Sequence, residues 1–101
     1  MVDVRLRPAA EKDFIDIGDF TRERWSEAQA HIYLQDLLQT IRKIGDQPLL
    51  GEKLGGVRSG YRRRRSGSHL IFYLVASDDV IEVVRILHEK TDIGRHLDDQ
   101  P

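Results

Sequence analysis

Apolar and charged residues alternate over the first seven positions of the chain, where Val2, Val4 and Leu6 are separated by charged side chains. A period of two is typical of a strand with one buried face. Pro8 follows and ends this strand, and proline is tolerated at the first position of a helix. We therefore predict a short strand followed directly by a helix.

That first helix is predicted over residues 9–25. Apolar side chains recur there every three or four residues, which places them on one face of a helix. Acidic residues lie toward its N-terminal end, where the helix dipole favours negative charge. The recurring residues are Ala10, Phe14, Ile17, Thr21 and Trp25. We expect this helix to be packed along one side.

A second helix is predicted from Ser26 onward, after almost no connection. Ser26 and Gln29 have the spacing of a capping box, and Gly45 and Pro48 end the helix. Between them runs a broad apolar stripe, made of Ala30, Tyr33, Leu34, Leu37, Leu38, Ile41 and Ile44. Two helices with so short a link fold back as a hairpin, whose apolar faces must cover another layer.

The second half of the chain is predicted to supply that layer. Residues 45–60 are rich in glycine and indicate a long irregular connection. Strands are expected over 61–65, 69–75 and 80–88, separated by tight turns. Both faces of the last strand are largely apolar, so we expect it to be central. Strict alternation assigns Val80, Glu82, Val84, Ile86 and His88 to one face, and Ile81, Val83, Arg85 and Leu87 to the other.

The predicted fold class is α+β, with an N-terminal strand and a helical hairpin packed on an antiparallel sheet. We expect one domain over residues 1–97, in which Asp92 caps a last short turn, and a short tail at 98–101. Four aromatic side chains are assigned to the core: Trp25, Tyr33, Phe72 and Tyr73. For Trp25, the alternative is that it lines a groove.

Composition agrees with one soluble domain. A chain of 101 residues that is 40% hydrophobic can bury a single core. The absence of cysteine excludes disulfides and thiolate metal sites. The longest apolar run, residues 70–76, is too short to span a membrane, and the N-terminus lacks the continuous apolar core of a signal peptide. We therefore expect a soluble, cytoplasmic protein with no membrane contact.

Charge is distributed unevenly along the chain. Residues 53–77 carry six basic and no acidic side chains, whereas the segments before and after them are net acidic. This stretch contains Arg62, Arg63, Arg64 and Arg65, whose side chains must alternate between the two faces of a strand. Guanidinium groups bind phosphates and carboxylates bidentately, which indicates a partner-binding strand. The alternative is an edge strand that charge protects from pairing with other chains.

Three histidines offer acid–base chemistry. His69 begins one predicted strand and His88 ends the next, so an antiparallel hairpin brings them together, and His96 follows near the end of the chain. With arginines to stabilise a phosphorane, such a set could cleave RNA. The alternative is that these histidines are capping or packing groups. No histidine spacing indicates a zinc site, and no phosphate-binding loop or nucleophile motif is present, so no metal or cofactor is expected.

The chain resembles the ParE branch of the RelE/ParE toxins of bacterial toxin–antitoxin systems. The resemblance covers essentially the whole chain. The segments that carry it are PAAEKDF at 8–14, TRERW at 21–25, GYR at 60–62, GSHLIFY at 67–73 and VRILH at 84–88, followed by Asp92 and the pair Arg95 and His96.

This resemblance implies a fold that agrees with the predicted elements, and two possible activities. ParE toxins inhibit DNA gyrase and are held inactive by a ParD antitoxin, whereas RelE toxins share the fold but cut messenger RNA on the ribosome. RelE-like nucleases carry basic residues on the first strand after the helices, which Arg62 and Arg64 match. Their central arginine on the next strand is replaced here by Leu70, and no tyrosine follows Tyr73.

We therefore expect a gyrase inhibitor that acts by binding and is not an enzyme. The alternative is a ribosome-dependent mRNA endonuclease that uses Arg62, Arg64, His69 and His88. A third possibility is a decayed member that retains only antitoxin binding.

Two surfaces are predicted to bind partners. The resemblance implies that the C-terminal part of a ParD-like antitoxin wraps the toxin with a helix and a strand. The candidate antitoxin contacts are Phe20, Tyr33, Arg62, Arg63, Arg64 and Arg65. The candidate gyrase contacts, within residues 85–97, are Arg85, His88, Lys90, Arg95 and His96. This mixed polar segment suits a protein partner better than bare nucleic acid, so no strong direct nucleic-acid binding is expected. The alternative is that Ile93 and Leu97 merely close the core there.

Overall fold

The computed structural model describes residues 2–54 and 60–92. Its elements are β1 (Asp3–Leu6), α1 (Pro8–Arg24), α2 (Glu27–Asp46), a 3₁₀ turn η1 (Pro48–Leu50), β2 (Glu52–Lys53), β3 (Tyr61–Ser66), β4 (His69–Ser77) and β5 (Val80–His88). The predicted α+β class and helical hairpin are confirmed. None of the helices in these two ranges is long and apolar enough to cross a bilayer. The predicted turn after Asp92 and the tail at 98–101 lie outside the described residues.

The five strands form one sheet in the order β1-β5-β4-β3-β2. Strand β5 is central, as its two apolar faces predicted, and it pairs antiparallel with β4. On its other side β1 pairs with it in parallel, from Asp3 opposite Val80 to Leu6 opposite Val83. The sheet is therefore mixed, because the N-terminal strand joins the expected antiparallel sheet as a parallel edge strand.

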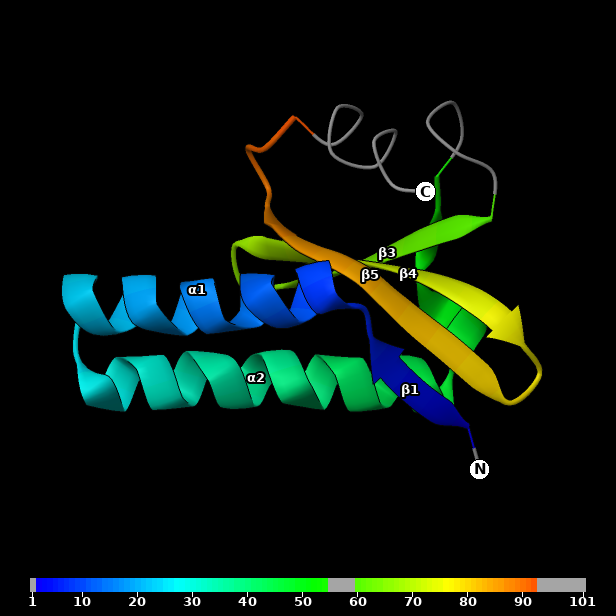
Figure 1. Cartoon of the computed structure of the whole chain (residues 1–101), viewed down its shortest axis with the longest axis horizontal. Helices are drawn as coiled ribbons and strands as arrows, with labels where there is room; N and C mark the ends of the chain where they lie inside the picture. Colours follow the sequence, from blue (N-terminus) through cyan, green and yellow to red (C-terminus); the bar gives the residue numbers. More distant parts are fainter. Residues whose placement is uncertain (1, 55–59, 93–101) are drawn as a thin grey trace.

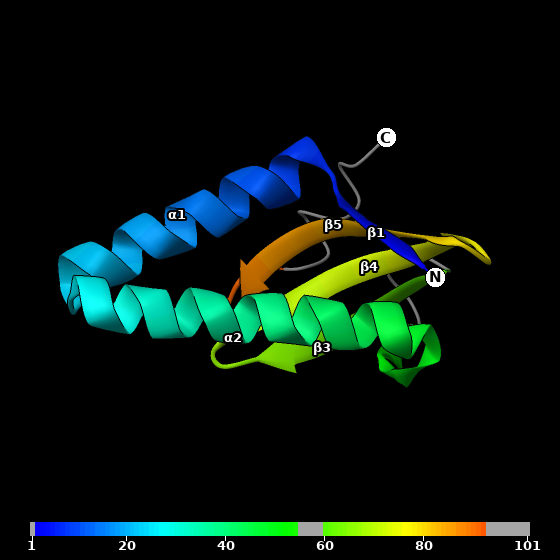
Figure 2. The same ribbon diagram turned by 90° about the horizontal axis from the view of Figure 1, so that it is seen from below.

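The helical hairpin covers one face of this sheet (Figures 1 and 2). Ser26 caps α2 by accepting a hydrogen bond from the Gln29 backbone N–H at 3.0 Å, as the capping-box spacing predicted. The core between the helices and the sheet contains Ala10, Ile17, Leu37, Ile41, Ile44, Ile71, Tyr73, Ile81, Val83 and Ile86. The apolar stripes of both helices therefore meet the strands.

The expectation of an irregular connection over residues 45–60 is wrong in part, because this segment contains η1 and β2. The Tyr73 hydroxyl accepts from the Gly51 N–H at 2.9 Å and donates to the Pro48 carbonyl at 2.7 Å. A Cβ atom at Gly51 would clash with that hydroxyl, so only glycine permits this approach. The contact brings β2 against β3, which is consequently not an edge strand over its first residues.

A second apolar cluster lies on the opposite face of the sheet. It contains Tyr61, Leu70, Phe72, Val84 and Leu87. The prediction that the side chains of β5 alternate strictly between the two faces is wrong, because the pairing with β4 shifts between Phe72 and Tyr73. This irregularity adds one residue to β5, as a β-bulge does. Val83 and Ile86 consequently both belong to the helix-side core, while Val84 and Leu87 belong to the other cluster.

The assignment of four aromatic residues to the core is correct for Phe72 and Tyr73, which are fully buried. Trp25 is 71% exposed, so its assignment to the core is wrong. It follows the last residue of α1, at the tip of the helical hairpin, and this tip reaches past the sheet (Figure 1). Tyr33 is half-buried and contacts β4.

Candidate functional site

Two histidines meet where β4 begins and β5 ends. His69 and His88 are direct partners in the register of these strands, and their rings lie edge to face with centroids 5.4 Å apart. The predicted proximity of the two side chains is thus confirmed. It arises because the antiparallel hairpin places the first residue of one strand opposite the last residue of the other.

Tyr33 of α2 holds this end of the sheet against the helices. Its hydroxyl lies 2.5 Å from Nδ1 of His69 and accepts a hydrogen bond from the Ser68 backbone N–H at 3.0 Å. Gly67 in the same turn has φ of +60°, and a Cβ there would lie 2.8 Å from the Tyr33 ring. Glycine therefore satisfies both the backbone conformation and the close approach of the tyrosine.

The hydrogen bonds favour one arrangement of protons on the two rings. Donation of the Tyr33 O–H to Nδ1 of His69, while the Tyr33 oxygen accepts from Ser68, satisfies all three groups and corresponds to a neutral His69 ring with its proton on Nε2. Burial, and then the neighbouring His88, lower the pKa of His69, which favours this neutral form. His88 accepts the Lys90 backbone N–H at Nδ1 (3.2 Å), so its neutral form also carries the proton on Nε2.

A cavity of about 290 Å³ opens beside the two rings, between α1 and the end of β5. We call it the histidine pocket; it is lined by Asp13, Asp16, Ile17, Phe20, His69, Ile86, Leu87 and His88. Phe20 is 62% exposed, and the guanidinium of Arg24 lies 5.9 Å from its ring centroid. Of the two aromatic antitoxin candidates, Phe20 lines the pocket and Tyr33 positions one of its histidines.

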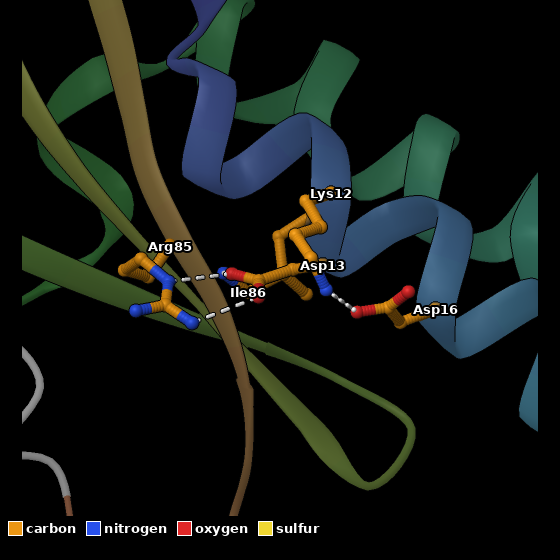
Figure 3. Close-up of polar contacts among 5 residues, drawn as sticks. All are labelled: Lys12, Asp13, Asp16, Arg85 and Ile86. Carbon is orange, nitrogen blue, oxygen red and sulfur yellow. Dashed lines mark hydrogen bonds and ion pairs between the residues drawn. The ribbon is translucent and has the colours of Figure 1, made fainter.

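Asp13 of α1 binds the edge of β5 beside this pocket (Figure 3). Its carboxylate accepts from Nε and Nη2 of Arg85 at 2.7 and 2.9 Å and from the Ile86 backbone N–H at 2.9 Å. The two side chains are 13% and 17% exposed, and the hydrogen bond to Asp13 raises the pKa of Arg85. Lys12 pairs with Asp16 on the same helix, in an exposed contact. Arg85, a candidate gyrase contact, is thus engaged within the fold.

The four consecutive arginines alternate between the faces of the sheet, as the strand prediction requires. Arg62 and Arg64 pair with Tyr73 and Ile71 and share the helix-side face. Arg62 donates to the carbonyls of Leu49 and Gly51. The side chain of Arg64 makes no hydrogen bond or ion pair with any other described residue.

On the opposite face, two arginines lie beside carboxylates. Arg63 contacts Glu52 at 3.3 Å, and Arg65 contacts Glu89 at 3.0 Å. These four residues surround Leu70, which is 7% exposed and packs in the second apolar cluster. The position where a RelE-like nuclease carries its central arginine is therefore a buried, apolar part of this face.

The remaining candidates lie at the C-terminal side. His88 and Lys90 are exposed at the end of β5. Arg95, His96 and the core-closing alternative at Ile93 and Leu97 fall outside the described residues. Across the described ranges, no three histidine, aspartate or glutamate side chains come together as a metal-binding group.

The sequence patterns did not reveal the roles of two residues. Tyr33 binds a histidine 36 residues away, and Asp13 binds an arginine 72 residues away. No local pattern marks either contact, because each depends on the packing of a helix against a distant strand. The signal in the sequence was weak: Tyr33 belongs to the apolar stripe of its helix, and Asp13 directly precedes Phe14 in the stripe of the other helix.

Comparison with known proteins identifies close relatives. A family model described as the ParE toxin of the type II toxin–antitoxin system parDE matches residues 4–93. A toxin named ParE1 from Mycobacterium tuberculosis is 39% identical over 92 residues, which are 91% of this chain and 94% of that protein. A toxin of the same name from Caulobacter vibrioides is 38% identical over 93 residues, covering 92% and 95%.

Solved structures share the fold at low sequence identity. A chain of the chromosomal ParDE system of P. aeruginosa superposes with a TM-score of 0.75 at 17% identity, covering 87% of this chain and 96% of that one. A chain of the RelBE2 toxin–antitoxin complex of Mycobacterium tuberculosis has a TM-score of 0.65 at 17% identity, covering 86% and 96%. Architecture therefore does not separate the two branches.

Proposed function

Because this chain belongs to the ParE toxin family of type II toxin–antitoxin systems, we propose that it inhibits DNA gyrase by binding and is neutralised by a ParD-like antitoxin. Gyrase inhibition is the activity that the resemblance to the ParE branch implies. Antitoxin binding is supported by the structurally similar Pseudomonas chain, which belongs to a ParDE system. This function requires the protein to act in the cytoplasm, where gyrase works.

The observation that favours binding over RNA cleavage is the environment of Leu70. Cleavage needs a cation that stabilises negative charge as the phosphorane forms. Leu70 is apolar and packs in the cluster of Phe72, Val84 and Leu87, so the position of the RelE-like central arginine supplies no cation of its own. Loss of one such donor typically lowers a rate by roughly a hundred- to a thousandfold.

The proposed gyrase surface is the end of β5 and the segment after it. His88 and Lys90 are exposed there, and Arg95 and His96 follow in the sequence. Arg85 acts indirectly, because its ion pair with Asp13 fixes the β5 edge that leads into this surface. A surface of mixed charge suits a protein partner better than a phosphate backbone does.

The proposed antitoxin surface combines Phe20 and Tyr33 with the arginines at 62–65. Arg63 and Arg65 already pair with Glu52 and Glu89, and carboxylates of an antitoxin would compete for them. Exposed ion pairs contribute little to folding, so such an exchange costs little.

Purified toxin should be assayed for gyrase supercoiling and DNA cleavage, beside a ribosome-programmed mRNA cleavage assay. We expect inhibition of supercoiling with trapped DNA breaks, and no codon-specific RNA cuts. A triple variant, Lys90→Ala, Arg95→Ala and His96→Ala, should lose both gyrase effects while keeping its fold and antitoxin affinity. A charge-matched control, Arg42→Ala with Lys43→Ala on the exposed side of α2, should stay active. A triple variant that inhibits gyrase normally would remove this surface from the proposal.

A second candidate function is RNA cleavage by Arg62, Arg64, His69 and His88. The contact between the two histidine rings favours it, because a base and an acid must lie close together. Codon-specific cuts mapped by primer extension, and lost on Arg64→Ala or His88→Ala, would establish this activity instead. A toxin inactive in both assays that still binds its antitoxin would be a decayed member.

A further inference from the structure

The histidine pocket has the size and lining of a site for one side chain of a partner. Its volume of about 290 Å³ lies at the lower limit of the usual range for ligand pockets. Ile17, Phe20, Ile86 and Leu87 give it apolar walls. The large exposed fraction of Phe20 leaves apolar surface that a partner would cover.

Two of the polar side chains that line this pocket, His69 and His88, can donate hydrogen bonds. In their neutral forms His69 and His88 use Nδ1 within the fold and carry their protons on Nε2. No hydrogen bond among the described residues uses either Nε2 atom. The two rings thus offer N–H groups beside an apolar wall, and these groups need an oxygen acceptor.

The charges around the pocket indicate which acceptor fits. Among the described residues, no lysine or arginine lines the pocket. Asp13 pairs with Arg85 and Asp16 with Lys12, while the guanidinium of Arg24 lies 5.9 Å from the ring centroid of Phe20 at the pocket wall. Asp16 would also repel a second carboxylate. An uncharged carbonyl matches these donors best. Extended chain presents free carbonyl oxygens beside its side chains, whereas carbonyls inside a helix are already bonded.

We propose that the histidine pocket binds an extended segment of the antitoxin, which inserts an apolar side chain against Phe20 and aligns a main-chain carbonyl with Nε2–H of His69 or His88. This inference rests on the antitoxin partner of the proposed function and specifies how that partner is recognised. A second copy of the chain is the competing occupant, and the test below distinguishes it from the antitoxin.

The test measures affinity between full-length toxin variants and the antitoxin encoded beside the toxin, by calorimetry. Phe20→Ala removes the apolar wall and should weaken binding about tenfold or more, as for an interface anchor. His69→Asn keeps an oxygen near the position of Nδ1 for Tyr33 but has no Nε2–H, and should weaken binding about three- to tenfold. His88→Gln, whose amide nitrogen reaches toward the position of Nε2, should weaken it less than His88→Asn.

His31→Gln is the matched control, because His31 is exposed on α2 and does not line the pocket; it should leave the affinity unchanged. Long-range ¹H–¹⁵N spectra of the free toxin should show the Nε2–H tautomer at His69, and this signal should shift on binding.

Three results would overturn the proposal. Phe20→Ala changes an exposed residue and should not disturb folding. If Phe20→Ala and His69→Asn both bind the antitoxin with normal affinity, the pocket is not part of the antitoxin interface, although the antitoxin remains the partner. Failure of the wild-type toxin to bind the antitoxin would overturn the partner of the proposed function, and this assignment with it. Dimerisation of the free toxin, abolished by Phe20→Ala in light scattering, would assign the pocket to a second copy instead.

Discussion

Tyr33 connects helix α2 to the turn between β3 and β4 through a single hydroxyl group. That group satisfies both the Ser68 backbone N–H and Nδ1 of His69. Removing it leaves Nδ1 of the half-buried His69 without its partner, which typically costs about 1–3 kcal/mol, and opens the exposed Ser68 N–H to water. At this end of the sheet, the position of His69 therefore depends on one side chain from another layer.

Tyr33→Phe should lower the free energy of unfolding by about 1–3 kcal/mol, measured by urea denaturation at neutral pH. Trp25→Phe is a suitable control, because it also reduces an aromatic side chain of the hairpin but at an exposed position. Its effect should stay within about 0.5 kcal/mol. Equal stability of the Tyr33→Phe variant and the wild type would show that the hydroxyl contributes nothing net.

His69 should make folding stability depend on pH. Tyr33 of α2, His88 of β5, Asp13 of α1 and Glu89 after β5 all face it, and burial followed by His88 lowers its pKa below 6.5. A lowered pKa means that the unfolded chain binds the proton more readily, so the stabilisation is present above about pH 6.5 and is lost as pH falls through the folded pKa.

Urea denaturation between about pH 7.5 and pH 5 should therefore show decreasing stability on acidification, above the range where carboxylates titrate. His69→Asn, which keeps an acceptor for Tyr33, should reduce this slope, whereas His31→Gln should preserve it. An identical slope in His69→Asn would mean that another group is responsible.

At the scale of the elements, β1 is shorter than β5, and a side chain of α1 covers the part of the β5 edge that β1 does not reach. β1 ends at Leu6, opposite Val83, while β5 continues to His88. Beyond that point the exposed edge of β5 is bonded by Asp13, which accepts the Ile86 N–H and the Arg85 guanidinium. The carboxylate of Asp13 thus covers the edge of β5 beyond the end of β1, which covers the earlier part of the same edge.

Asp13→Ala should lower the free energy of unfolding by about 3 kcal/mol, because it leaves a mostly buried guanidinium unpaired. Hydrogen exchange of the Ile86 amide should accelerate as well. Asp16→Ala on the same helix is the matched control, since its ion pair is exposed, and it should show no measurable change. A double variant, Asp13→Leu with Arg85→Leu, should recover part of the loss, and no recovery would argue against an unpaired charge as the cause.

At the scale of the whole molecule, positive charge is concentrated in residues 53–77 while the rest of the chain is net acidic. The arginines of β3 divide between the two faces of the sheet, and two of them lie beside Glu52 and Glu89. The fold therefore partly neutralises its own basic strand, which leaves exchangeable ion pairs rather than a purely positive surface.

Antitoxin binding should consequently weaken as salt increases, since exposed charges are screened over about 8 Å at physiological ionic strength. Arg63→Ala with Arg65→Ala should lower the affinity and reduce its salt dependence. Arg42→Ala on exposed α2 is the control and should change neither. Affinity that is insensitive to the arginine substitutions and to salt alike would remove electrostatics from this interface.

The sequence by itself determined the elements and the family. Period-two and period-3.6 patterns, the Ser26 cap and the short turns act over a few residues, so the helices, the three long strands and the facing of His69 and His88 could be predicted from neighbours along the chain. The order of the motifs was sufficient for the ParE resemblance, and the apolar residue at position 70 was sufficient to favour that branch.

Only the tertiary structure decided which parts of these elements are covered by other elements. Trp25 continues the periodicity of α1 but is exposed, because the sheet beneath the hairpin ends before it. Strand β2 depends on the Tyr73 hydroxyl, and the faces of β5 depend on a shift in its pairing. The contacts of Tyr33 and Asp13 join residues far apart in sequence. Periodicity fixes which side of an element is apolar, whereas the extent of the surface that covers it depends on how distant segments pack.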